Sequence, residues 1–135
     1  MIKSFFILLI LSLFVLTSCD PYGGYQYIVN NGSEKIVFVQ YQELYNDTIF
    51  TKKVNPMNSV LIIKFESHNG LYDYKKDFLN RYFKTFSIYA DSINGSFLKK
   101  NFRKREAWDY NVQKTGCLGR CGENIYTYKI NNSEL

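Results

Sequence analysis

Apolar and polar residues alternate with a period of two along most of the chain after residue 24. The pattern is carried by segments rich in β-branched and aromatic residues: 25–29, 35–41, 48–54, 59–65, 85–90, 107–114, 124–130 and a shorter one at 96–98. A period of two places successive side chains on opposite faces of an extended backbone, as in a β-strand. The pattern therefore predicts seven or eight short strands.

Turn residues separate these segments, and they indicate the fold class. Asn, Gly, Ser, Asp and Pro cluster at 30–33, 46–47 and 55–58. Apolar residues at helical spacing over 77–83 predict one short helix or wound loop. Short strands with closely spaced turns are typical of an all-β protein, and we predict an antiparallel β-sandwich over residues 25–135. A small closed barrel is the alternative fold.

The first eighteen residues form a different kind of segment. Lys3 supplies a positive charge, and residues 5–16 are apolar apart from Ser12. These twelve residues would span about 18 Å as a helix, well short of the roughly 30 Å hydrocarbon core of a bilayer. A basic start followed by an apolar run of this length indicates a removable signal peptide at 1–18.

The end of this run, Leu16-Thr17-Ser18-Cys19, resembles the bacterial lipobox. The resemblance implies that the Cys19 thiol carries a diacylglyceryl group, that the chain is cleaved before Cys19, and that the new amine is acylated. It implies a lipoprotein anchored in the membrane by its acyl chains. We expect the cell envelope, and specifically the outer membrane of a Gram-negative bacterium, with the side of that membrane left open. Residues 19–24 then form the lipidated cysteine and a tether.

The order of motifs after Cys19 is similar to that of small immunoglobulin-like envelope lipoproteins. These motifs are an early tyrosine-rich strand, a tryptophan strand near the end, and a closing Tyr-x-Tyr-x-Ile strand. Here they are Tyr25-Gln26-Tyr27, Trp108-Asp109-Tyr110 and Tyr126-Thr127-Tyr128-Lys129-Ile130. The resemblance covers most of the mature chain. It implies an immunoglobulin-like sandwich and an envelope location, and it implies no activity.

Assigning Cys19 to the lipid leaves two cysteines, Cys117 and Cys121, in a glycine-rich loop. The envelope is an oxidising compartment, so an even pair of thiols predicts a disulfide between them. A redox pair or half of a metal site are the alternatives. Redox pairs usually have two intervening residues, and structural zinc needs four ligands, whereas this chain has one His in total. We therefore expect no metal.

Charge points to one candidate binding surface. The chain carries +5, and loss of Lys3 with the signal lowers this to +4, a balance that does not predict a nucleic-acid partner. The densest cluster lies among aromatic residues and comprises Lys99, Lys100, Arg103, Lys104 and Arg105. We interpret it as a possible anion-binding face for lipopolysaccharide phosphates or an acidic glycan. The alternative is a solvated turn whose charges keep a strand edge from pairing with other proteins.

Catalytic signatures are sparse. His68 is the only histidine and lies in a turn-like segment, there is no Gly-x-Ser-x-Gly elbow, and the carboxylates show no marked pairing in sequence. We therefore expect a non-catalytic binding or assembly module, with no cofactor beyond the covalent lipid and with an envelope protein or glycan as partner. The twelve tyrosines suggest a surface glycan-binding lipoprotein as one alternative, through exposed aromatics. An enzyme acting on cell-envelope material is the other.

Overall fold

The computed structural model describes residues 23–67, 79–90, 98, 101–115 and 121–135, and these residues form an all-β sandwich of seven strands. The strands are β1 (Gly23–Asn31), β2 (Val37–Glu43), β3 (Ile49–Val54), β4 (Asn58–Ser67), β5 (Phe83–Ala90), β6 (Trp108–Lys114) and β7 (Gly122–Ile130). Two single-turn 3-10 helices, η1 (Arg105–Ala107) and η3 (Asn132–Glu134), complete the described elements. The predicted fold class is confirmed. Of the predicted eighth strand, 96–98, only Leu98 is described, and it is not in a strand.

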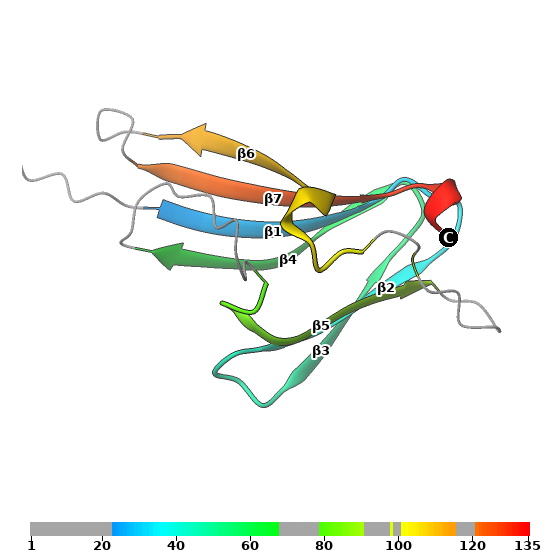
Figure 1. The fold of residues 1–135 in the computed structure, drawn as a ribbon, viewed down its shortest axis with the longest axis horizontal. Coiled ribbons are helices and arrows are strands. Elements are labelled where there is room, and N and C mark those ends of the chain that lie inside the picture. The colour runs from blue at the N-terminus through cyan, green and yellow to red at the C-terminus, as the bar shows by residue number, and fades with distance from the viewer. Residues whose placement is uncertain (1–22, 68–78, 91–97, 99–100, 116–120) are drawn as a thin grey trace, which may run out of the picture.

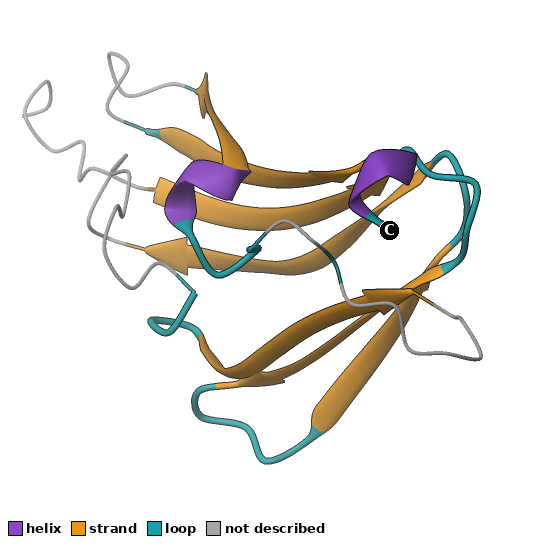
Figure 2. Ribbon diagram, turned by 45° about the vertical axis from the view of Figure 1, so that its right-hand side comes forward, coloured by secondary structure: helices purple, strands orange, loops and turns teal. Residues whose placement is uncertain are grey.

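The strands form two sheets that face each other (Figures 1 and 2). One has four strands in the order β4-β1-β7-β6, and the other has three in the order β3-β2-β5. All neighbouring pairs are antiparallel except β1 and β7, which run parallel at the centre of the larger sheet. This order differs from the ABED and CFG sheets of the immunoglobulin constant-type fold. The likeness to that fold therefore lies in the sandwich architecture and not in the strand order.

Strand β1 begins earlier than the sequence predicts. Gly23 and Gly24 were expected in the flexible tether, but they pair with Ser67 and Glu66 of β4 on one side and with Gly122 and Glu123 of β7 on the other. A Cβ atom at Gly24 would lie 3.2 Å from the Cγ atom of Glu123. Gly24 thus allows a close approach between strands, a role that a glycine in a strand often has.

Aromatic side chains dominate the space between the sheets. Tyr25, Tyr27, Tyr126 and Tyr128 are fully buried on the inner face of the larger sheet. The rings of Tyr27 and Tyr126 stack with centroids 5.1 Å apart, and Trp108 meets Tyr27 edge-on at 5.8 Å. Burial raises the pKa of Tyr27 and of Tyr128 above the ordinary tyrosine value. The tyrosine-rich strands therefore supply core rather than surface.

One side of the sandwich, between β5 and β6, is covered by the segment that leads into η1. The Phe102 ring lies 5.9 Å from that of Phe86 and 6.4 Å from that of Tyr128, so it contacts both sheets. The indole N–H of Trp108 donates a 2.6 Å hydrogen bond to the carbonyl of Phe102. This segment thus closes the core where the two edge strands do not meet.

The opposite side is joined by polar contacts. The register of β1 and β4 shifts between Tyr27 and Ile28, and Ile62 lies in the bulge that results. The Tyr41 hydroxyl donates to the Ile62 carbonyl at 3.0 Å, and Lys52 Nζ donates to the Leu61 and Ile62 carbonyls at 2.7 and 2.9 Å. The bulge leaves carbonyl groups without a ladder partner, and side chains of the other sheet satisfy them.

The sheets converge near the C-terminus and separate toward the other end (Figure 2). A buried side chain, Asn31, holds the narrow end. Its amide nitrogen lies 2.7 Å from the Lys35 carbonyl, 3.1 Å from that of Val54 and 3.2 Å from that of Asn55. Its oxygen accepts from the Ser33 backbone N–H at 3.1 Å and from the Ser33 hydroxyl at 2.6 Å. One asparagine therefore ties the turn after β1 to the turn between β3 and β4.

A single wound turn lies at the wide end, where the sequence predicts a short helix or wound loop over 77–83. The backbone N–H groups of Tyr82 and Phe83 donate to the Leu79 carbonyl at 3.1 and 2.9 Å. Leu79 and Phe83 are buried, and Tyr82 is half-buried. The wound-loop alternative is confirmed for the described part, and residues 77–78 lie outside it.

Candidate binding site at the wide end

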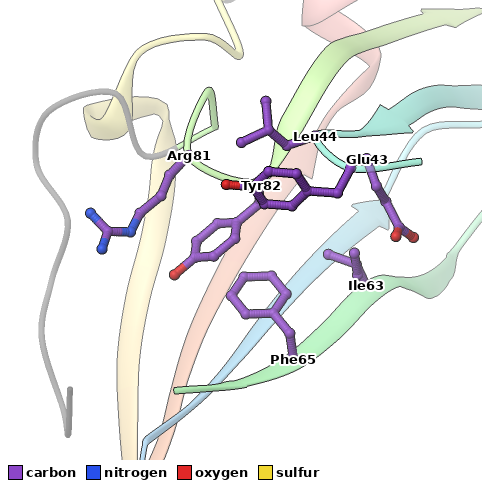
Figure 3. A pocket seen from close by; sticks show the side chains of 7 residues that line it. Glu43, Leu44, Ile63, Phe65, Arg81 and Tyr82 are labelled. Carbon is purple, nitrogen blue, oxygen red and sulfur yellow. The ribbon is translucent and has the colours of Figure 1, made fainter. Parts of the chain in front are cut away.

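An apolar pocket of about 160 Å³ opens at the wide end of the sandwich (Figure 3). Its walls come from the end of β2, the loop that follows, strand β4 and the wound turn before β5. The lining residues are Glu43, Leu44, Tyr45, Ile63, Phe65, Arg81 and Tyr82. We call this site the wide-end pocket.

Two rings form the apolar wall of the wide-end pocket. The centroids of Phe65 and Tyr82 are 3.7 Å apart, with an angle of 38° between the rings. Tyr25 lies behind them, 5.6 Å from Phe65 and 6.0 Å from Tyr82. Because Phe65 belongs to β4 and Tyr25 to β1, the pocket wall continues into the core of the domain. The position of the rings is therefore fixed by the packing of the larger sheet.

Backbone hydrogen bonds hold the loop between β2 and β3, residues 44–48, over the pocket. The Leu44 N–H donates to the Tyr82 carbonyl at 2.8 Å, which fixes the loop to the wound turn. Asn46 N–H donates to the Glu43 carbonyl at 3.3 Å, and Asn46 Oδ1 accepts from Thr48 N–H at 2.9 Å. The contact between Thr48 N–H and Asn46 Oδ1 is an Asx turn, in which a side chain replaces a backbone acceptor. The loop is thus ordered although it is exposed.

The size and polarity of the wide-end pocket limit what it can bind. An engineered protein cavity of about 150 Å³ holds one benzene molecule, so about 160 Å³ suits one ring or a short alkyl group. The charged lining residues are Glu43 and Arg81, which lie on opposite sides of the two rings (Figure 3). The arrangement favours burial of an apolar group with polar contacts at the rim, as ligand pockets commonly do.

Exposed aromatic residues are few among the described residues. Tyr45 is the one described tyrosine that is exposed, with 96% of its surface accessible. On the outer face of the three-stranded sheet, the rings of Phe38 and Tyr89 stack with centroids 5.6 Å apart, and both are partly buried. Glycan binding needs an extended platform of aromatic rings, and on this face such a platform would have to include Phe38 and Tyr89. Tyr22, Tyr72 and Tyr74 lie outside the described residues.

The predicted anion-binding cluster is described only in part. Lys99 and Lys100 lie outside the described residues, and Lys104 is exposed. The Arg105 guanidinium lies 5.1 Å from the ring centres of both Tyr110 and Tyr126, and it donates to the Trp108 carbonyl at 2.8 Å. Arg105 therefore packs against the sandwich.

Arg103, from the same cluster, also contacts the domain. Its guanidinium lies 5.7 Å from the Phe102 ring centre and donates to the Phe86 carbonyl at 3.4 Å. The two arginines have partners within the domain, which the charge pattern alone does not show. Anion binding by this cluster stays a prediction.

The remaining predicted site residues fall mostly in other parts of the chain. Cys19, His68 and Cys117 lie outside the described residues. Cys121 is buried and lies directly before β7. No disulfide occurs within the described part of the chain, so the predicted Cys117–Cys121 bond gains no support from the structure and stays a prediction.

Comparisons of the chain with known proteins identify no family for it. No protein-family model, curated protein or solved structure matches the chain. Within the described ranges, no group of three or more His, Cys, Asp or Glu side chains is placed to hold a metal ion. No helix in those ranges is long and apolar enough to cross a bilayer. The candidate site therefore depends on the geometry of the wide end.

Sequence reasoning missed the wide-end pocket. Its lining comes from segments up to thirty-nine positions apart, Glu43 to Tyr82, and no local motif links them. One signal was available. Leu44 and Tyr45 are apolar residues directly before the turn signal Asn46-Asp47, where a solvated loop would usually be polar.

Proposed function

We propose that the protein is a lipid-anchored envelope lipoprotein that acts as a non-catalytic binding or assembly module. In this proposal Cys19 carries the acyl chains that hold the protein in the outer membrane. The observation that carries the binding role is the wide-end pocket, which is preformed, apolar and framed by an ordered loop with an exposed tyrosine. Its ligand is an envelope protein or glycan that presents one ring-sized apolar group.

The anchor is tested by replacing Cys19. Lipoprotein acylation joins the acyl chains to this thiol and to the amine created by cleavage, so Cys19→Ala should abolish incorporation of labelled palmitate and release the protein from the membrane fraction. Cys117→Ala is the matched control, because it removes a thiol and leaves the lipobox intact. If both variants take up palmitate equally, Cys19 is not the anchor.

The pocket is tested with a ring-sized probe, para-cresol, in a nuclear magnetic resonance titration of the isotope-labelled protein. The amide signals of Leu44 and Tyr82 should shift as the probe binds, since these residues line the site. Ile63→Phe adds volume inside the pocket and should weaken binding. Leu61→Phe makes the same kind of change on the same strand, at an exposed residue that does not line the pocket, and should leave binding unchanged. Equal effects of the two variants would refute the pocket as the binding site.

A second candidate function is glycan binding on the outer face of the three-stranded sheet. It is favoured by the stacked rings of Phe38 and Tyr89, which are neighbours in register on β2 and β5. On the other side of Phe38, Lys53 of β3 is its partner in register. Aromatic faces flanked by polar side chains are suited to sugar rings. Tyr89→Ala should then abolish retention on an immobilised envelope glycan, while Ile63→Phe should not affect it.

We also propose that Cys117 and Cys121 form a disulfide in the mature protein. Three residues separate them, so the bond would close a small ring and contribute toward the low end of the usual range of about 2–4 kcal/mol. Intact mass measured after alkylation, with and without reduction, tests this directly. Two alkyl groups added without reduction would contradict the bond.

A further inference from the structure

We propose that the loop between β2 and β3, with Tyr45 at its tip, lies in the headgroup region of the membrane that holds the anchor. This inference depends on the proposed lipid anchor at Cys19. The occupant of the exposed apolar side chains of this loop is then the bilayer itself, while the wide-end pocket beside them is left to the ligand of the proposed function. The argument comes from the length of the tether, from the end of the domain to which it leads, and from the chemistry of the loop.

The tether is short compared with the domain. Only residues 20–22 separate Cys19 from the first residue of β1, Gly23. At 3.3–3.6 Å per residue, the α-carbons of Cys19 and Gly23 are at most about 14 Å apart. The nine residues of β1 span roughly 30 Å at the usual rise of a strand. When β1 is perpendicular to the membrane, the tether is therefore too short to reach past the length of β1. The end of the domain that holds the far end of β1 then cannot be the end nearest the membrane.

The start of β1 and the exposed loop lie at the same end of the sandwich. Tyr25, two residues into β1 from Gly23, is 6.0 Å from the Tyr82 ring, and the Tyr82 carbonyl accepts from the Leu44 N–H at 2.8 Å. In Figure 1 both features lie at the left of the molecule, and the C-terminus lies at the other end. The anchor thus holds the wide end, and with it the loop, nearest the membrane.

The loop has the chemistry of an interfacial contact. Tyr45 is 96% exposed, and its neighbour Leu44 is 39% exposed. Ile49, at the start of β3, is 60% exposed. Tyrosine is enriched at membrane–water interfaces because its ring is apolar while its hydroxyl reaches the headgroups. Because backbone hydrogen bonds already hold the loop, little conformational entropy is lost when it enters the interface.

The opposite end supplies a matched control residue. Met57 lies in the turn between β3 and β4, has a positive φ of 55° and is 69% exposed. The neighbouring Asn55 carbonyl is within 3.2 Å of the Asn31 amide nitrogen, which places this turn at the far end of β1. Met57 and Tyr45 are therefore both exposed apolar residues, separated by about the length of β1.

The experiment compares Tyr45→Trp with Met57→Trp in the full lipoprotein, reconstituted into vesicles of phosphatidylethanolamine and phosphatidylglycerol. The native tryptophan, Trp108, is buried and gives the same background in both variants. At position 45 we expect blue-shifted emission, loss of most of the added fluorescence when brominated lipids are included, and protection from acrylamide. At position 57 we expect water-like emission, quenching by acrylamide and no effect of brominated lipids.

The outcomes separate this inference from the proposed function. If the lipoprotein fails to float with the vesicles, the anchor proposal fails and the loop proposal fails with it. If the protein floats but positions 45 and 57 respond alike to both quenchers, only the loop proposal is overturned. Protection of position 45 from acrylamide in native membranes, without quenching by brominated lipids in vesicles, would show a protein partner on the loop and would also overturn the proposal.

Discussion

Replacing Asn31 should destabilise the domain more than most single substitutions would. The side chain is fully buried and connects the turn after β1 with the turn between β3 and β4. Asn31→Ala removes the side-chain acceptor of the Ser33 backbone N–H and the side-chain donor to the Val54 carbonyl, and both of these hydrogen bonds are buried. Each buried polar group left without a partner costs about 1–3 kcal/mol, so we expect a loss of about 3–4 kcal/mol in the free energy of unfolding.

Two further variants divide this effect into its parts. Ser33→Ala removes the hydroxyl contact to Asn31 and the two 3.3 Å contacts of that hydroxyl to the Lys35 carbonyl and N–H. It leaves the contacts of Asn31 to backbone groups in place, so it should cost less, about 1–2 kcal/mol. Asn31→Asp keeps the shape but points an oxygen at the carbonyls of Lys35 and Val54. Burial and these carbonyls should raise the pKa of the new carboxyl above its unfolded value of about 3.9. Its destabilisation should therefore be largest at neutral pH and become smaller as the pH falls through the raised pKa.

Urea denaturation of the chain from Asp20 onward measures these differences. Trp108 is the single tryptophan and is buried in the core, so its fluorescence reports unfolding. The reasoning is refuted if Asn31→Ala costs no more than Ser33→Ala at neutral pH. It is also refuted if the cost of Asn31→Asp does not depend on pH.

Three other predictions follow from the packing. Lys52→Met should destabilise the domain by about 1–2 kcal/mol in urea titrations because it removes the charged donor of the Leu61 carbonyl and one of the two donors of the Ile62 carbonyl, whereas Lys53→Met, at an exposed neighbour, should change little. Gly122→Ala should cost at least about 2–3 kcal/mol by thermal denaturation, since Gly122 has a φ of 155° and its new Cβ would lie 2.3 Å from a backbone oxygen of β6. Because burial raises the pKa of Tyr27 and Tyr128, their contribution to stability is present below about pH 10 and should be lost above it. Tyrosinate absorbance should then rise together with unfolding, and ionisation of both groups in the intact fold would contradict this.

The sequence determined the strands because their signal is local. Alternation in residues 25–29 and 124–130 reflects the two faces of each extended segment, and turn residues such as Asn46 and Asp47 mark where a segment ends. The seven strands accordingly appear close to their predicted bounds. Gly23 and Gly24 were misread, since a glycine indicates a flexible tether and a close strand contact equally well from sequence alone.

Only the tertiary structure decided which face of each strand is buried and which strands are neighbours. Tyr25 and Tyr27 alternate with Gln26 and Ile28, and this pattern does not say which pair faces the core. Burial of the tyrosines follows from the second sheet packed against them, and the parallel pairing of β1 with β7 joins segments about a hundred residues apart. The wide-end pocket exists for the same reason. Its lining residues share no local pattern, so the site forms only where the ends of two separating sheets place them around one space.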